Sequence, residues 1–232
     1  MIRRKNIIEA LLILKLLNSI KDEWQLLITL GAHSEKDKEY SSMITEYIRK
    51  TSLPTVIGFG YKLISPEETG LYTIVDLFGI ADAIITTSTR EGFGFTYTEG
   101  WLANKKVIGR RINFIFKDLE ANGLNLKHFY NKILVNNKDF ADYSNDVQLN
   151  LLDKLDYKNL LKQEEIKRMV DFLEKGDDQV IKDNKKKVIE NYSLEAYAER
   201  LRKIIKAAES MHKKKFTQPK IDNIHLIEYF KK

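Results

Sequence analysis

The stretch AIITTSTREGFGFTYTEG, residues 83–100, decides how this chain of 232 residues is interpreted. An apolar run typical of a buried strand comes first, a loop with two glycines follows, and a helix-prone segment completes the stretch. In an open parallel α/β sheet, ligands bind where the carboxyl end of a strand leads through a loop into a helix. The stretch has the pattern of such a junction, and it therefore predicts both a fold class and the place of a binding site.

Two glutamates and two glycines give this junction its chemistry. A carboxylate such as Glu91 or Glu99 can accept two hydrogen bonds from vicinal hydroxyls, as ribose or a hexose presents them. Gly92 and Gly94 let the main chain approach a ligand closely, and the helix that begins near Thr96 offers N–H groups to a phosphate. A diphosphate between two hydroxyl-bearing groups describes a nucleotide-diphosphate sugar. The alternative is that Glu91 is a solvated loop residue and Glu99 only a favourable charge near a helix N-terminus.

Apolar runs and helix-prone stretches alternate on both sides of the junction. Strands are expected at residues 24–31, 55–60, 82–88, 106–110 and 131–135. Helices are expected at residues 5–20, 35–50, 66–79, 96–104, 164–175, 178–191 and 194–211, and a short apolar tail at 224–230. This alternation predicts a parallel, doubly wound α/β sheet with helices on both faces. We expect one α/β domain over residues 1–210 and a C-terminal tail over residues 211–232.

The composition excludes several classes of site. The chain has no cysteine, so it can hold neither a disulfide framework nor a thiolate metal site, and its four histidines are isolated in the sequence. No apolar stretch reaches the roughly 18 residues of a membrane span, because Glu9 and Lys15 interrupt the longest one. The net charge of +6 comes from scattered lysines and arginines without a clustered basic face, which argues against nucleic acid as a partner. We expect a cytoplasmic protein with at most peripheral membrane association.

The segment ADAIITTSTREGFGFTYTEGWLANKKVIG, residues 81–109, resembles the hallmark segment of the retaining GT-B glycosyltransferases. That family, the sucrose-synthase-like glycosyl transferases of group 1, carries E-G-F-G and a second glutamate in its C-terminal donor-binding domain. Two flanking segments are similar as well, RRKNIIEALLIL at residues 3–14 and NYSLEAYAERL at residues 191–201. The resemblance implies a Rossmann-like domain that takes part in moving a hexose from a nucleotide-diphosphate sugar to an unknown acceptor, with retention of anomeric configuration.

The resemblance also implies a role for individual residues. Glu91 would contact donor-sugar hydroxyls near the reacting carbon, and Lys5, with Arg4 a weaker candidate beside it, would neutralise the leaving diphosphate. The other implied donor-binding residues are Gly92, Phe93 and Gly94 through their main-chain amides, Glu99 at the ribose hydroxyls, and Gly60 and Tyr61 at the base pocket. A positioned cation and helix-end amides stabilise such a leaving group more in the transition state than in the ground state. The family needs no metal cofactor.

The sequence departs from the family pattern in three places. Residues 101–106 stand where the family usually has small residues and a glycine–proline pair. The family also has a strand with an arginine ahead of the lysine that matches Lys5, and an N-terminal acceptor-binding domain, neither of which this sequence includes. We therefore expect a fragment or one half of a split enzyme, with a separate N-terminal acceptor domain or subunit as partner. The alternative is a non-catalytic module that binds a nucleotide or a protein on the same scaffold.

Overall fold

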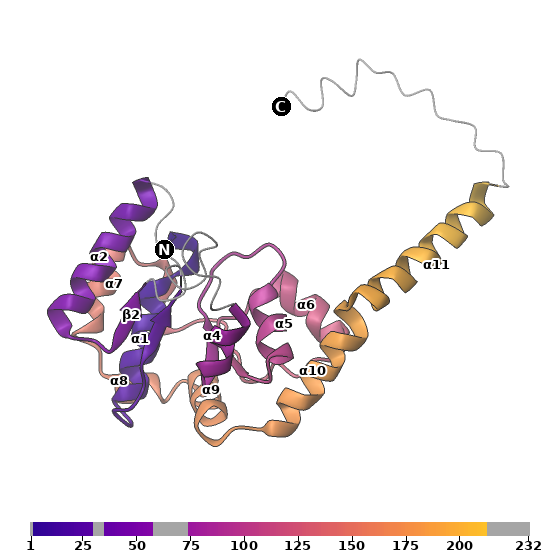
Figure 1. Cartoon of the computed structure of the whole chain (residues 1–232). Helices are drawn as coiled ribbons and strands as arrows, with labels where there is room; N and C mark the ends of the chain where they lie inside the picture. The colour runs from indigo at the N-terminus through magenta and orange to yellow at the C-terminus, as the bar shows by residue number, and fades with distance from the viewer. Residues whose placement is uncertain (1, 30–34, 58–73, 213–232) are drawn as a thin grey trace, which may run out of the picture. The chain divides into compact units, whose positions relative to one another are not determined.

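The computed structural model describes residues 2–29, 35–57 and 74–212 (Figure 1). In the described residues, strands and helices alternate as far as residue 135, and only helices follow residue 139. The chain divides into two compact units, Met1–Ile189 and Glu190–Lys232. The strands and the predicted site belong to the first unit, and helix α11 (Leu194–His212) belongs to the second. The expectations that lie outside the described residues are Gly60 and Tyr61 at the base pocket, the helix start at residues 66–68, and the apolar tail at residues 224–230.

Two pairs of parallel strands form the β-structure around the site. Strand β1 (Leu26–Ile28) pairs with β2 (Thr55–Ile57), and β3 (Ala83–Thr86) pairs with β4 (Lys106–Gly109). The mixed α/β class is therefore confirmed. Within the described residues the two pairs share no hydrogen-bonded ladder, so the single doubly wound sheet stays a prediction.

The apolar run at residues 131–135 does not add a fifth parallel strand. Its last part, β5 (Leu134–Val135), pairs antiparallel with β6 (Lys138–Asp139) instead. The two linking residues, Asn136 and Asn137, have φ angles of 49° and 60°. Two consecutive left-handed residues make the tight hairpin turn whose twist matches that of the flanking strands, and asparagine tolerates this conformation well.

Helices form where the sequence predicts them and at further places. The helices that match the prediction, besides α11, are α1 (Ile7–Asn18), α2 (Glu35–Thr51), α4 (Ile74–Ile80), α5 (Phe95–Leu102), α9 (Glu164–Lys175) and α10 (Asp178–Tyr192). The helices that were not predicted are α6 (Asn113–Ala121), α7 (Asn145–Leu152), α8 (Tyr157–Leu160) and the short 3₁₀ turns η1 (Arg3–Lys5) and η2 (Phe140–Asp142). The apolar run at residues 112–116 resembles a strand, whereas Ile115, Phe116 and Leu119 share one buried helical face.

Helix α1 lies at the centre of the larger core. Its residues Leu11, Leu12 and Leu16 are fully buried, and the helix lies against α7 and α8. Burial on nearly all sides explains why the helix is apolar all round rather than amphipathic. Because α1 cannot shift without opening this core, the residues directly before it, among them Lys5, have a fixed place.

A second core of aromatic side chains holds α5 against α6, which lie next to each other in Figure 1. The rings of Tyr97 and Phe116 meet edge to face with centroids 5.2 Å apart, and Phe129 meets them at 5.6 and 5.0 Å. Val107 of β4 belongs to the same core. Edge-to-face pairs of this kind add to the energy of burial, so the aromatic core fixes α5 against the β3–β4 pair.

Helix α11 exposes apolar side chains at a spacing of three and four residues. Leu194, Tyr197, Leu201 and Ile204 are 82%, 65%, 42% and 65% exposed. Charged residues stand between them, as in an amphipathic helix. Among the described residues, no helix combines the length and the apolar composition that crossing a membrane requires.

Candidate functional site

An ion pair lies at the carboxyl end of β3, where the sequence predicts a site. Lys5 Nζ, in the last residue of η1, donates a hydrogen bond to Glu91 Oε1 in the loop after β3. The two residues are 86 positions apart in the sequence. The Glu91 side chain is 14% exposed and the Lys5 side chain 33%. The pair is therefore partly shielded from water without being sealed off from a ligand.

Glu91 is held in its ionised form. Burial alone would raise the pKa of this carboxyl group, but hydrogen bonds from Lys5 and Ser88 and the charges of Lys5 and Arg4 outweigh burial and lower the pKa. Ser88 Oγ donates to Glu91 Oε1 at 2.6 Å. The other carboxylate oxygen, Oε2, accepts no hydrogen bond from the described residues, so it can accept one from a ligand hydroxyl.

Hydrogen bonds to the main chain fasten the η1–α1 junction to the loop after β3. Thr89 N donates to Arg4 O at 2.9 Å. The Thr87 hydroxyl reaches both Lys5 O at 2.9 Å and Asn6 O at 3.1 Å. These bonds lie on both sides of Lys5 along the chain, so the backbone as well as the two side chains sets the Lys5–Glu91 pair.

Gly94 sets the start of α5. Its φ angle of 73° lies in the left-handed region that favours glycine. A Cβ at this position would lie 2.8 Å from Cγ2 of Ile115 on α6, so the loop packs closely against that helix. The helix begins at the next residue, Phe95, and its first N–H groups and positive dipole end therefore directly follow the glycine loop.

Phe93 and Phe95 stand exposed on either side of Gly94. They are 83% and 64% exposed, and their rings stack with centroids 5.6 Å apart and planes 23° from parallel. Gly92 is exposed as well. The sequence predicts a role only for the Phe93 main chain; the stacked pair of rings is a feature of the structure.

Glu99 and Arg4 are both exposed, in different ways. Glu99 lies in the second turn of α5, and its side chain makes no hydrogen bond or ion pair with any described residue. Arg4 lies in η1, and its charge helps to lower the pKa of Glu91. The structure thus brings Lys5, Glu91 and Arg4 together, and it leaves Glu99 separate from them on the adjoining helix.

A buried charge cluster that the sequence analysis did not predict connects α1, β4 and β6. Arg110, the residue after β4, donates to both carboxylate oxygens of Glu9 at 2.9 and 2.6 Å. It also donates to both oxygens of Asp139, each at 2.8 Å, and Tyr130 donates its hydroxyl to Glu9 at 2.6 Å. A buried charge requires such partners. Glu9, an acid inside an apolar helix, was a signal for the cluster, but nothing in the sequence points to Arg110.

The charges in this cluster are coupled. Burial acts to lower the pKa of Arg110, but hydrogen bonds to Asp139 and Glu9 outweigh burial and raise the pKa. Burial raises the pKa of Glu9, and hydrogen bonds from Arg110 and Tyr130 act against this shift. Because every partner of the Glu9 carboxyl group can donate an N–H or O–H hydrogen, the geometry fits its ionised form.

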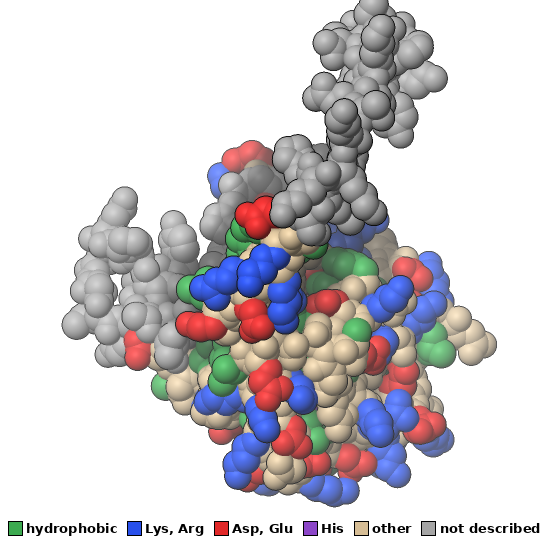
Figure 2. Space-filling view, turned by 90° about the vertical axis from the view of Figure 1, so that its right-hand side faces the viewer, with side chains coloured by type: hydrophobic (Ala, Val, Ile, Leu, Met, Phe, Trp, Pro, Cys, Tyr) green, Lys and Arg blue, Asp and Glu red, His purple; other side chains and the backbone are tan. Residues whose placement is uncertain are grey.

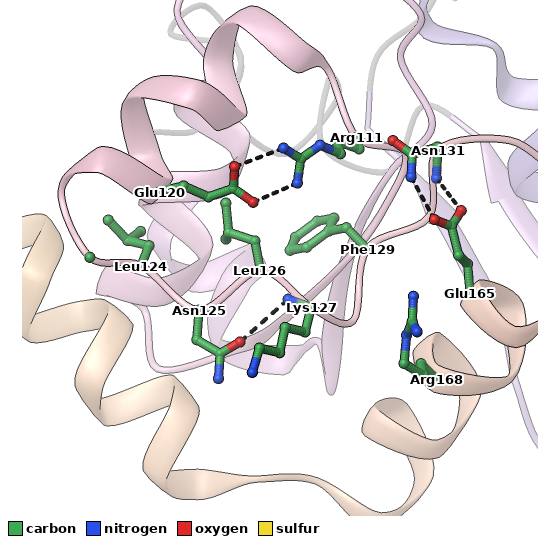
Figure 3. A pocket seen from close by; sticks show the side chains of 11 residues that line it. Arg111, Glu120, Leu124, Asn125, Leu126, Lys127, Phe129, Asn131, Glu165 and Arg168 are labelled. Atoms are coloured by element: carbon green, nitrogen blue, oxygen red, sulfur yellow. Dashed lines mark hydrogen bonds and ion pairs between the residues drawn. The ribbon is translucent and has the colours of Figure 1, made fainter.

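A pocket of about 500 Å³ lies between the loop after α6 and the start of α9 (Figure 3). Arg111 and Glu120 pair across one wall at 2.5 and 2.7 Å. On the other wall, Glu165 accepts hydrogen bonds from the main chain and side chain of Asn131 at 2.7 and 2.5 Å. None of the predicted site residues lines this pocket, so it is distinct from the site at the end of β3.

The described residues contain no group of three or more acidic or histidine side chains arranged to hold a metal. His128 is instead part of the core: its ring stacks on Phe172 with centroids 3.8 Å apart, and burial lowers its pKa to about 4.

On the face shown in Figure 2, lysine and arginine side chains alternate with aspartate and glutamate rather than forming one continuous basic patch.

Comparison with known proteins finds a distant relative. The chain is 31% identical over 121 residues to mannosylglucosyl-3-phosphoglycerate synthase of Petrotoga mobilis (strain DSM 10674 / SJ95). The match covers 51% of this chain and 22% of that protein, so the chain spans only a small part of that relative's length. No protein-family model and no solved structure matches the chain. The similarity supports a distant relationship to a glycosyltransferase.

Proposed function

We propose that this chain is the donor-binding part of a retaining GT-B glycosyltransferase, which moves a hexose from a nucleotide-diphosphate sugar to an acceptor. The observation that carries the proposal is the Lys5–Glu91 ion pair at the carboxyl end of β3, directly before the glycine loop and α5. In open α/β sheets this edge is where ligands bind. The distant glycosyltransferase relative supports the same class of reaction.

Lys5 would act on the leaving group. When the bond between the sugar and the diphosphate breaks, negative charge grows on the phosphate oxygens. A nearby ammonium group and the N–H groups at the start of α5 stabilise that charge more as it develops, which lowers the barrier. Lys5 pairs with Glu91 in the free protein, so a bound diphosphate would share or take over this cation.

Glu91 and Glu99 would recognise the two hydroxyl-bearing ends of the donor. Glu91 is ionised and has an oxygen that is open to a hexose hydroxyl. Glu99 is exposed on α5 and is available to the ribose hydroxyls. The main-chain amides of Gly92, Phe93 and Gly94 would bind the sugar and diphosphate between the two carboxylates. No step in this scheme uses a metal cofactor.

Calorimetric titration with UDP, GDP and ADP and with their glucose and mannose conjugates tests the proposal. We expect one nucleotide to bind saturably, and Glu99→Gln to weaken it by about tenfold or more, the usual cost of removing a hydrogen bond to a charged group. Glu174→Gln, an exposed glutamate on α9, is the matched control and should bind like the wild type. Equal affinity in the Glu99 and Glu174 variants would contradict the assignment of Glu99.

A turnover assay distinguishes an enzyme from a module that only binds the nucleotide. The chain would be mixed with a matching N-terminal acceptor domain, the acceptor of that domain and a sugar nucleotide, and the release of nucleoside diphosphate would be followed. Turnover supports the transferase if NMR shows that the transferred hexose has the same anomeric configuration in the product as in the donor. Binding without turnover under these conditions would favour the non-catalytic alternative.

A further inference from the structure

A chain of buried hydrogen bonds runs from Arg110 through Glu9 to Asn6, the residue directly after Lys5. All five N–H hydrogens of the Arg110 guanidinium have an acceptor: the two oxygens of Glu9, the two oxygens of Asp139, and Asn131 O. Only a planar fork of donors can satisfy two carboxylates in this way, and a lysine ammonium cannot. The position of Glu9, in the first turn of α1, is therefore tied to the end of β4.

Glu9 in turn holds Asn6. Asn6 Nδ2 donates to Glu9 Oε2 at 2.8 Å, and Asn6 Oδ1 accepts from Arg3 Nη1 at 3.1 Å. Asn6 is fully buried and has φ and ψ of 50° and 48°, a left-handed conformation that ends η1 and lets α1 begin in a new direction. Both ends of its side-chain amide are thus used to hold this bend, and the bend directly follows Lys5.

The chain of contacts returns to the site through the main chain. Lys5 O and Asn6 O both accept from the Thr87 hydroxyl, and Arg110 N donates to Thr86 O at 2.8 Å. Gly109 makes that approach possible, because with φ of 135° any Cβ there would lie 1.9 Å from Thr86 O. The η1–α1 junction, the residue after β4 and the end of β3 are therefore joined in one closed ring of hydrogen bonds that includes the main chain of Lys5.

We propose that Arg110, Glu9 and Asn6 are positioning residues that hold the Lys5 ammonium group against Glu91. The proposal rests on the proposed function, in which Lys5 meets the diphosphate. None of the three touches a reacting group; they act through the bend at Asn6. The alternative is that the cluster only stabilises the fold, in which case its loss would lower stability without changing the surroundings of Glu91.

The pKa of Glu91 distinguishes these roles, since Lys5 and Ser88 lower it in the wild type. It can be measured in the free, full-length chain by ¹³C NMR of labelled glutamate carboxyl groups, assigned with Glu91→Gln. Asn6→Gly is the informative variant, because glycine keeps the left-handed bend and loses only the amide contacts. We expect the pKa of Glu91 to rise toward its ordinary value in Asn6→Gly and in any folded Arg110→Lys.

Two controls match these variants. Ile13→Val removes a methylene group from the buried middle of α1 and so lowers stability, but it changes none of the hydrogen bonds described above. Arg111→Lys changes the neighbouring arginine, which pairs with Glu120. Neither control should move the pKa of Glu91. An unchanged Glu91 pKa in folded Asn6→Gly, or an equal shift in Ile13→Val, would overturn the positioning role.

Nucleotide titration gives the second readout. We expect Asn6→Gly to bind the nucleotide that the wild type selects among UDP, GDP and ADP about two- to tenfold more weakly, a loss the size of one hydrogen bond. Unchanged affinity would overturn the link between Asn6 and the diphosphate. If the wild type binds none of the three, the proposed function fails, while the Glu91 pKa still reports whether these residues hold Lys5 in place.

Discussion

Acid should destabilise this protein through His128. The ring of His128 is buried, and its Nε2 lies 2.9 Å from Val107 O, an oxygen that can only accept a hydrogen bond. Nε2 therefore carries the hydrogen. Burial lowers the pKa of His128 from 6.5 to about 4, so the folded protein keeps this histidine neutral at pH values where an exposed histidine takes up a proton.

The direction of the effect follows from linkage. Below pH 6.5 the unfolded chain binds a proton at His128, and the folded chain does not do so until about pH 4. The stability is fully present above pH 6.5 and is lost progressively as the pH falls toward 4. At 1.36 kcal/mol per pKa unit, the complete loss is about 3 kcal/mol, and about 2 kcal/mol of it is lost between pH 7.5 and pH 5.

Urea unfolding of the wild type and His128→Gln at pH 7.5 and pH 5 measures how much His128 contributes to the pH dependence of the free energy of unfolding. Glutamine can donate a hydrogen bond to Val107 O but does not titrate. Carboxyl groups whose pKa differs between the folded and the unfolded protein also contribute to the pH dependence, so the comparison is between the two proteins. The wild type should lose about 2 kcal/mol more free energy of unfolding than the variant. Equal losses in the two proteins would show that His128 is not held neutral by burial.

Three further substitutions test other parts of the structure. Gly94→Ala places a Cβ 2.8 Å from Ile115 at φ of 73°. The left-handed backbone alone should lower the free energy of unfolding by about 1–2 kcal/mol, measured by denaturation. An unchanged denaturation midpoint would contradict this geometry. Arg110→Met should lower the free energy of unfolding by about 3–5 kcal/mol, because it leaves buried carboxylates without their cation. Arg111→Met changes a pair nearer the surface and should lower it by less than about 1 kcal/mol. Similar losses in the thermal unfolding of the two variants would refute this difference. Phe116→Ala should cost about 3–5 kcal/mol in urea unfolding, since the ring is fully buried among aromatic partners, and a loss below about 1 kcal/mol would argue against that core.

The sequence was sufficient for the elements with a clear period or clear ends. Helix α9 spans Glu164–Lys175 as predicted, because its apolar residues recur at helical spacing and Gly176 follows its last turn. Helix α6 was not predicted although Ile115, Phe116 and Leu119 recur at helical spacing, because Ile112, Phe114 and Phe116 also alternate as in a strand. Contacts with the aromatic core decide the conformation. The antiparallel hairpin of β5 was missed because its turn depends on two left-handed asparagines rather than on glycine.

The site divides in the same way. The glycine loop and the helix after it were predictable from local sequence, and α5 begins at Phe95. Only the family resemblance assigned Lys5 and Glu91 to one donor site, and it did not predict their ion pair, because spacing alone does not bring residues 86 positions apart together. Arg110 was not predicted because its partner Glu9 is 101 positions away, and periodicity carries no information on contacts of that range.

The central claim is that Lys5 and Glu91 form the donor-diphosphate site, and titration of Lys5→Met tests it most directly. Lys15→Met is the matched control, since Lys15 lies on α1 and pairs with Asp153 instead. The wild type and Lys15→Met should bind one of UDP, GDP and ADP with similar affinity, and Lys5→Met should bind it about tenfold or more weakly. Equal affinity in all three folded proteins, or no binding by the wild type, would contradict the claim.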